Sequence, residues 1–412
     1  MELKITDFKV FTAQANFEWT FVKVYSKDLY GVGEAGPAPG LKGMESEFKQ
    51  LLLGEDAFKI NRIEQKLRYA TLYSGSTTHH LVAGTIIAIY DLITKYLNIP
   101  LYKFLGGDRD EIRVYADAHA GNGLEAINSL LLPVSLCDNK HAEIRSNIPI
   151  SGRLTEDKWE KEYSVEAFVK RAKDLVNEGY TAIKFDLDIP TPYLNLGRIR
   201  VGDLSLKDID FMIEIIKAIR DSIGNEIDLM VDLHWRYNLN IVLRLCKALS
   251  PYRLRWIEDP TPASIGLSNF DELRIIAERC NTPIAIGETL YSYQQFKDLI
   301  PSKILVWTPD IAKTGIIEGR RIIELASMYD IEFSPHNIGS PIATMATAHL
   351  SSLSNTLGAM EFHAHDLPFW NEIVRPKKRI IDHGFIKLND EPGLGIDLDT
   401  DAAKKYWDDI DL

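Results

Sequence analysis

The sequence predicts an α/β fold: a (β/α) barrel of the TIM type with an N-terminal α+β capping domain. From residue 113 onward, strand-like and helix-like patterns alternate at regular spacing, and eight strands can be counted. Such alternation indicates a parallel sheet, and eight βα units can close it into a barrel. Before residue 113 the pattern differs, with short β-like runs followed by two helices. A chain of 412 residues is long enough for both parts.

The capping domain is predicted to span residues 1–112. LKITDFKVFTA and WTFVKVYS alternate in hydrophobicity as strands do, and the glycine-punctuated GVGEAGP follows them. Helical patterns lie at about 44–70 and 79–97, and the segment closes on Pro100 and the Gly106-Gly107 pair. The last residues, 375–412, read as short strands and turns rather than another βα unit, so we expect them to complete this domain.

The barrel is predicted to span residues 113–374. Its first strand is IRVYADAHA, and the stretch 122–160 that follows has no clear period, which leaves its role open. The other strands are expected at 181–188, 228–235, 254–260, 283–289, 304–310, 331–336 and 357–363. Helical patterns such as VEAFVKRAKDLVNEG and IIEGRRIIELASMYD lie between them.

The composition is that of a globular protein, with 45% hydrophobic and 26% charged residues. A net charge of −12 argues against nucleic acid or an anionic membrane as the main partner, but it does not exclude an anionic small molecule. The apolar stretch 81–97 is interrupted by Asp91 and Lys95 and is typical of a core helix rather than a membrane span. Because the first residues alternate like a strand and lack an apolar signal core, we expect a cytoplasmic protein.

The three cysteines, Cys137, Cys246 and Cys280, lie far apart and include no C-x-x-C pair. This pattern favours reduced thiols that serve packing over a disulfide framework or a cysteine metal site.

Polar residues cluster at the ends of the predicted barrel strands, where the active-site face of such a barrel lies. From the third strand to the eighth, the acids and the histidine that end each strand follow one another at intervals of 22 to 30 residues, about one βα repeat. Surface acids placed at random would not keep this phase. The strand-end residues are Lys184, Asp186, Asp232, His234, Glu258, Asp259, Glu288, Asp310, His336 and Glu361.

Three of these carboxylates, Asp232, Glu258 and Glu288, end successive strands and would repel one another strongly without a cation. An all-oxygen ligand set suits Mg²⁺. Each acid alone could cap a helix or be solvated, but three in phase favour a metal site.

Asp310 and His336 end neighbouring strands, which suggests a histidine base oriented by a carboxylate. A histidine bonded to a backbone carbonyl is the alternative. His234 lies two residues after Asp232 and so faces the same side of the strand. It is either a second proton-transfer group or a core histidine.

Lys184 shares a strand face with Asp186 by the same argument, so it either stabilises developing negative charge or pairs with Asp186. Glu361 is either a substrate contact or a solvated acid. His79 and His80, after the GST turn, either reach the barrel mouth or begin a helix.

Taken together, GVGEAGP, GYTAIKFD, DLMVDLHWRYN, RWIEDP, IAIGET, PDIAKTG, SPHNIGSP and PGLGID occur in the order found in a known family. The sequence resembles the enolase superfamily, in its mandelate-racemase-like subgroup of acid-sugar dehydratases similar to galactonate and gluconate dehydratases. By this resemblance Asp232, Glu258 and Glu288 match Mg²⁺ ligands. Asp310 and His336 match a His–Asp dyad, His234 matches the extra histidine of D-x-H dehydratases, and Glu361 matches the acid of the eighth strand.

Departures from the subgroup are informative. Racemases carry K-x-K on the second strand, whereas the second position here is Asp186, which disfavours two-sided racemisation. Cycloisomerases and dipeptide epimerases place lysine where Asp310 stands. The Gly-Gly pair after the sixth strand is Gly315-Ile316 here.

The resemblance implies a Mg²⁺-dependent dehydratase that turns a sugar acid into a 2-keto-3-deoxy acid. His336 would take the C2 proton, Lys184 would stabilise the ene-diolate, and His234 would protonate the leaving C3 hydroxyl. Capping loops at 16–20 and 73–80 would cover the substrate, and Asp186, Trp19, Tyr73 and His79 are the expected substrate contacts. The alternatives are a one-base racemase or epimerase of a hydroxy acid and a non-catalytic relative. Members of this family commonly assemble symmetrically, so we expect a homo-oligomer.

Overall fold

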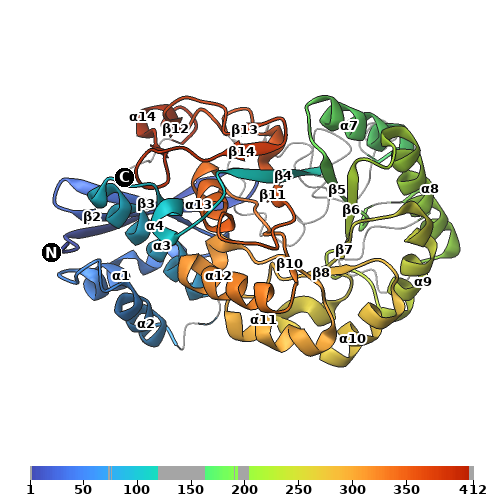
Figure 1. The fold of residues 1–412 in the computed structure, drawn as a ribbon, viewed down its shortest axis with the longest axis horizontal. Helices are drawn as coiled ribbons and strands as arrows, with labels where there is room; N and C mark the ends of the chain where they lie inside the picture. The colour runs from blue at the N-terminus through green and yellow to red at the C-terminus, as the bar shows by residue number, and fades with distance from the viewer. Residues whose placement is uncertain are drawn as a thin grey trace.

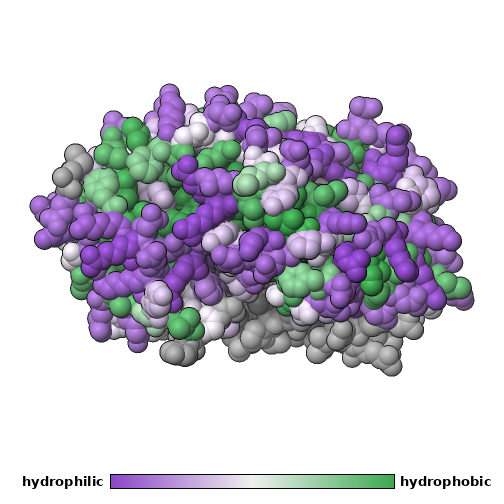
Figure 2. Space-filling model, turned by 60° about the horizontal axis from the view of Figure 1, so that its bottom comes forward, coloured by the Kyte–Doolittle hydropathy of each residue, from purple (hydrophilic) through white to green (hydrophobic). Residues whose placement is uncertain are grey.

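The computed structural model describes residues 2–72, 75, 77–118, 163–189, 191–193 and 204–407. The stretch 122–160 and the expected contact Tyr73 lie outside these residues. Figure 1 shows the N-terminal elements on one side, the barrel on the other, and the C-terminal segment lying along both. On the face in Figure 2, hydrophilic side chains dominate and hydrophobic ones form separate patches.

The N-terminal part is a three-stranded antiparallel sheet of order β1-β2-β3 packed against helices. The glycines of GVGEAGP allow close packing, because a Cβ at Gly31 or Gly33 would lie 2.0 or 2.1 Å from a carbonyl oxygen of α3. Its elements are β1 (Asp7–Gln14), β2 (Glu18–Ser26), β3 (Leu29–Ala35), η1 (Leu41–Met44), α1 (Glu45–Leu52), α2 (Ile60–Ala70), α3 (Thr77–Leu97) and α4 (Leu101–Leu105).

Within the described residues, α3 is the one helix long and apolar enough to cross a membrane. However, 78% of its apolar window is buried inside the protein, where α3 packs on β3 and α12. Such burial is that of a core helix.

The predicted eight-stranded parallel barrel is confirmed. Strands β4 to β10 pair in sequence order, β11 pairs with β4, and a parallel bridge between Phe333 and Leu357 closes the ring. The strands are β4 (Glu111–Ala118), β5 (Ala182–Asp186), β6 (Asp228–Asp232), β7 (Ile257–Glu258), β8 (Ile284–Ile286), β9 (Val306–Trp307), β10 (Glu332–Phe333) and β11 (Met360–Phe362).

Helices follow the strands on the outside of the barrel (Figure 1). The α-helices are α7 (Val165–Asn177), α8 (Leu206–Ile223), α9 (Leu239–Leu249), α10 (Phe270–Arg279), α11 (Tyr293–Leu299), α12 (Ile311–Met328) and α13 (Pro341–Ser351). Short 3₁₀ turns are η5 (Ser250–Tyr252), η6 (Pro262–Leu267), η7 (Ile300–Ser302) and η8 (Ala364–Asp366).

Side chains fill the interior of the barrel. Large residues such as Tyr115, Met230 and Trp256 alternate with small ones such as Ala182 and Ala285 in a buried cluster separate from the outer core. The interior is therefore a packed core rather than a channel. The polar side chains of the candidate site lie at the open end of the barrel, where the strands finish.

The C-terminal segment contacts both parts of the chain. Its elements are β12 (Val374–Arg375), β13 (Ile381–Asp382), β14 (Phe385–Lys387), β15 (Asp397–Leu398) and α14 (Thr400–Ala403). β14 pairs antiparallel with β4 of the barrel, and the indole N–H of Trp407 donates to the Gln14 carbonyl of β1 at 2.9 Å. The domain boundary placed at 112 and 113 stays a prediction.

The prediction of reduced thiols is wrong for one pair of cysteines. Cys246 in α9 and Cys280 just after α10 form a disulfide, with their Cα atoms 5.3 Å apart. They are 34 residues apart in sequence, about one βα repeat, so they face each other on neighbouring helices. Two cysteines that are one repeat apart in the sequence are thus neighbours in the barrel. Cys137 lies outside the described residues.

Candidate active site

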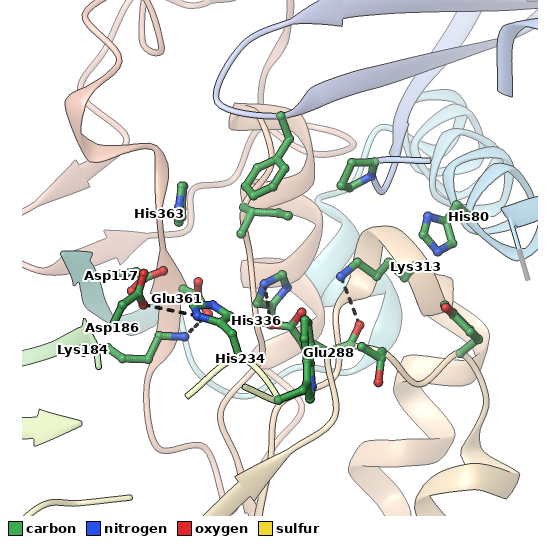
Figure 3. A pocket seen from close by; sticks show the side chains of 16 residues that line it. His80, Asp117, Lys184, Asp186, His234, Glu288, Lys313, His336, Glu361 and His363 are labelled. Carbon is green, nitrogen blue, oxygen red and sulfur yellow. Dashed lines mark hydrogen bonds and ion pairs between the residues drawn. The ribbon is translucent and has the colours of Figure 1, made fainter. Parts of the chain in front are cut away.

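A cavity of about 240 Å³ lies where the carboxyl ends of the barrel strands meet the N-terminal part. The N-terminal part contributes Phe17, Pro37 and His80 to its wall. Figure 3 shows Lys184, Asp117 and Asp186 at one end, Lys313 and His80 at the other, and the His234 and His336 rings between them. Polar groups at or just beyond the ends of six barrel strands (β4, β5, β6, β8, β10 and β11), together with Lys313 and His80, thus line one cavity.

The three carboxylates expected to hold a metal lie together. Asp232 ends β6, Glu258 ends β7 and Glu288 follows β8, and one oxygen of each lies within 4.8 Å of the others. All three are buried, with exposures of 0%, 0% and 8%. Burial, opposed by Lys184 but reinforced by neighbouring acids, raises the pKa of Glu258 to about 7.

These residues fit a divalent cation. Glu258 Oε1 is buried without a hydrogen-bond partner in the described structure. Uncompensated buried carboxylates cost free energy, which a cation among the three oxygens would recover. An all-oxygen donor set is the preference of Mg²⁺.

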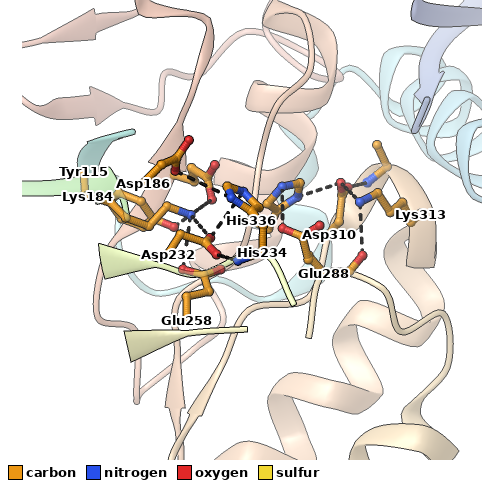
Figure 4. A network of polar contacts seen from close by, with 12 residues as sticks. Tyr115, Lys184, Asp186, Asp232, His234, Glu258, Glu288, Asp310, Lys313 and His336 are labelled. Carbon is orange, nitrogen blue, oxygen red and sulfur yellow. Dashed lines mark hydrogen bonds and ion pairs between the residues drawn. The ribbon is translucent and has the colours of Figure 1, made fainter. Parts of the chain in front are cut away.

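Lys184 is the cation beside this cluster (Figure 4). Its Nζ lies 3.2 Å from Asp232 Oδ2, 3.1 Å from Glu258 Oε2 and 3.3 Å from Glu361 Oε2. Burial opposes the charged form, but the surrounding carboxylates hold the pKa of Lys184 well above its usual value. Glu361 is buried, not solvated, and accepts a hydrogen bond of 2.7 Å from the Tyr115 hydroxyl.

Asp310 and His336 form the expected pair. His336 Nδ1 lies 2.9 Å from Asp310 Oδ2, so Nδ1 carries a hydrogen and Nε2 faces Glu288 Oε2 at 3.1 Å. Asp310 Oδ1 also accepts the N–H of Ala312 and caps α12, which fixes the carboxylate. Burial opposes protonation of His336, but Glu288 and Glu361 raise its pKa to about 9.

His234 also lines the cavity. Its Nδ1 is 3.0 Å from Asp188 Oδ1, and Asp188 in turn is held by Arg236 Nε at 2.9 Å. Nε2 lies 3.7 Å from Asp232 Oδ2, on the side of the carboxylate cluster. Asp186 also lines the cavity, and one of its carboxylate oxygens lies 3.9 Å from His234 Nδ1.

Two expected substrate contacts lie elsewhere. Trp19 is 1% exposed and packs against Phe369 and Trp407, because its position in β2 points into the core of the sheet. His79 lies outside the cavity lining, with Nδ1 bonded to Arg68. On α3 the side chain one position further, His80, faces the cavity, since neighbouring helical residues point about 100° apart.

Sequence reasoning missed Asp117, Asp188 and Lys313. Asp117 follows the same rule as the other strand-end acids, at the end of β4, and could have been found by it. Burial raises its pKa to about 7. Asp188 ends the expected strand 181–188, in phase with Lys184 and Asp186, and could have been found by the same rule. Lys313 lies in a helix, where strand phase gives no signal.

Known proteins resemble both parts of the chain. Residues 8–106 match the N-terminal domain of the mandelate racemase / muconate lactonizing enzyme family, and residues 167–402 match the enolase C-terminal domain-like family. The chain is 30% identical to a protein of Haloferax volcanii named D-xylonate dehydratase, covering 98% of this chain and 89% of that one. It is 28% identical to a D-mannonate dehydratase of Sphingomonas sp., covering 98% and 94%.

A solved structure from Rubrobacter xylanophilus, titled mandelate racemase/muconate lactonizing enzyme-like protein, has a TM-score of 0.85 to this chain. The two are 30% identical, and the match covers 98% of each. The expected family and fold, and the expectation of an enzyme, are confirmed. The chain therefore belongs to the enolase superfamily, in its mandelate racemase / muconate lactonizing enzyme branch.

Proposed function

We propose that this protein is a Mg²⁺-dependent dehydratase of a monocarboxylic sugar acid, an aldonate, which it converts to a 2-keto-3-deoxy acid. The observation that carries the proposal is the pair of histidines, His234 and His336, each oriented by a carboxylate and facing one cavity beside three buried acids. Two proton-transfer groups suit elimination, in which one proton leaves carbon and another reaches the departing oxygen. The names of the related dehydratases support the same reaction class.

Asp232, Glu258 and Glu288 would hold the metal, which when bound supplies positive charge to the substrate carboxylate as its α-carbon is deprotonated. A cation held by Glu288 would offset the negative charge that raises the pKa of His336, and His336 Nε2 would then accept the C2 proton while Asp310 keeps the hydrogen on Nδ1. The Lys184 ammonium stabilises the negative charge that develops on the carboxylate oxygens.

His234 Nε2 donates a proton to the C3 hydroxyl, so the C3–O bond breaks and water leaves. Asp188 accepts from Nδ1 and supports the doubly protonated ring that this step requires. The resulting enol takes a proton at C3 and becomes the 2-keto acid. The wall that the N-terminal part contributes limits access of water to these groups.

A panel of D-xylonate, D-mannonate, D-galactonate and D-gluconate with Mg²⁺ tests this function. We expect a 2-keto-3-deoxy acid from at least one member, loss of turnover with a chelator, and recovery with Mg²⁺. His336→Asn should abolish turnover, whereas His383→Asn, at a side chain 73% exposed, should not change it. Turnover of no aldonate by the metal-loaded protein would contradict the proposal.

We also propose a homo-oligomer. Tyr69, Leu72 and Met328 are apolar side chains exposed to 79%, 64% and 77%, which contact between copies would cover. Light scattering that gives the mass of one chain at micromolar concentration would contradict this assembly.

A further inference from the structure

Lys313, in the first turn of α12, is a buried cation that the proposed reaction does not use. Its side chain is 9% exposed and lines the cavity. An ammonium group has three N–H donors. Nζ lies 3.1 Å from the Glu288 carbonyl oxygen and 3.3 Å from Asp310 Oδ2, and these are its partners within the described part of the chain. One N–H is therefore left for the cavity.

His80, from α3, faces the same end of the cavity (Figure 3). Its Nδ1 lies 3.2 Å from the Gly36 carbonyl oxygen, which can only accept, so Nδ1 carries the hydrogen. Burial, together with the charge of Lys313, lowers the pKa of His80 to about 4 and keeps the ring neutral. Nε2 is then left with a lone pair and, among the described residues, has no hydrogen-bond donor.

Gly36 brings the two side chains together. A Cβ at this position would lie 2.7 Å from Lys313 Cγ and 3.3 Å from His80 Nδ1, so only glycine fits between them. The Gly36 N–H donates to the Ala312 carbonyl at 2.8 Å and ties this loop to the start of α12. The pair is therefore built across the contact between the N-terminal part and the barrel.

We propose that His80 and Lys313 together bind one hydroxyl group of the substrate chain, at the end of the cavity opposite Lys184, and so determine which sugar acids are accepted. This inference rests on the proposed function. A hydroxyl both donates and accepts, which matches one free lone pair and one free N–H. A second carboxylate or a phosphate only accepts and would face the lone pair of His80, while the charge of Lys313 is already paired with Asp310. The pair therefore favours aldonates over dicarboxylic sugar acids.

The test uses the best aldonate of the panel and the analogues that lack one hydroxyl beyond C3 each. We expect the wild-type protein to disfavour one analogue by at least about 10-fold in kcat/KM, since loss of that hydroxyl leaves buried polar groups unpaired. In His80→Phe and in Lys313→Met, the ratio of kcat/KM for the aldonate to kcat/KM for that analogue should be close to one. A ratio between two substrates cancels any general loss of rate that Lys313→Met causes through Asp310.

His79→Phe is the matched control, because His79 is the neighbouring histidine and lies outside the cavity lining; it should keep the wild-type ratio. His80→Gln, which keeps an acceptor, should retain part of the discrimination. If the wild-type protein disfavours none of the analogues, or if the ratio survives in both folded variants, the inference is overturned while the proposed function stands. If no aldonate is turned over, the proposed function fails and the inference with it.

Discussion

At the scale of single residues, most of the candidate site follows from one rule: polar residues at the ends of the predicted barrel strands lie on the active-site face. Asp232, Glu258, Glu288, Asp310 and His336 all meet at one cavity or directly beside it, because parallel strands of a barrel bring their carboxyl ends to one face. The rule gives positions along the chain but not the direction of a side chain outside the strands. It therefore could not separate His79 from His80 on α3.

Trp19 shows the same limit within a strand. Its neighbours in β2 alternate between two faces, and either face could have met the substrate. Trp19 faces the core because Phe369 and Trp407, from the C-terminal segment of the chain, pack against its indole ring. Contacts between residues so distant in sequence leave no local pattern.

Asp310→Asn tests the orientation of the candidate base. An asparagine amide can present N–H to His336 Nδ1 and so stabilise the wrong tautomer, and we expect kcat on the best aldonate to fall by about 100-fold or more. Asparagine can keep the bond to the Ala312 N–H and cap α12, but the buried Lys313 ammonium loses its paired carboxylate, so we expect a lower thermal stability as well. Steady-state kinetics and thermal unfolding measure the two effects. Asp330→Asn, in an exposed turn, is the control, and an unchanged kcat in Asp310→Asn would show that the dyad is not used.

At the scale of elements, the order of strands and helices was predictable because burial imposes a period on each. The eight barrel strands all appear, although several contain only two or three paired residues, such as β7 and β9. Pairing between helices was not predictable. Cys246 and Cys280 have no local signature, and the sequence argument for reduced thiols used spacing along the chain rather than the repeat of the barrel.

The disulfide should stabilise the outer layer at α9 and α10. Closing a segment of 34 residues restricts the unfolded chain, and by loop-closure entropy the bond contributes about 2–4 kcal/mol. Chemical denaturation should therefore give a lower free energy of unfolding with a reductant, and the same loss in Cys246→Ala with or without reductant. Cys137→Ala should keep the response of the wild-type protein. Equal stability in oxidised and reduced protein would contradict the expectation.

At the scale of the whole molecule, contacts between the N-terminal part, the barrel and the C-terminal segment hold the cavity together. Glu34 of β3 accepts the N–H groups of Ser340 and Ala343 at the start of α13, more than three hundred positions away. His349 of α13 accepts the N–H of Tyr102 in α4 and donates to the Leu394 carbonyl. Such junctions join residues far apart in the sequence and leave no local pattern, so the sequence predicts the parts and not how they dock.

His349 also makes stability depend on pH. Burial lowers its pKa from 6.5 to about 4, so below pH 6.5 the unfolded chain binds a proton that the folded protein does not. The contribution of neutral His349 to the free energy of unfolding is complete above pH 6.5. It is lost as the pH falls toward 4, by up to about 3 kcal/mol. The free energy of unfolding should therefore drop between pH 7 and pH 5 more steeply in the wild-type protein than in His349→Gln. Parallel profiles would mean that His349 is not neutral in the fold.

The central claim is that proton removal at C2 leads to loss of the C3 hydroxyl. The most direct measurement follows the best aldonate in D₂O with Mg²⁺ by nuclear magnetic resonance. We predict a 2-keto-3-deoxy acid that carries solvent deuterium at C3, where the enol is protonated, and recovered substrate with little deuterium at C2. Deuterium at C2 of recovered substrate without any 2-keto acid would contradict the account and would identify a one-base epimerase or racemase instead.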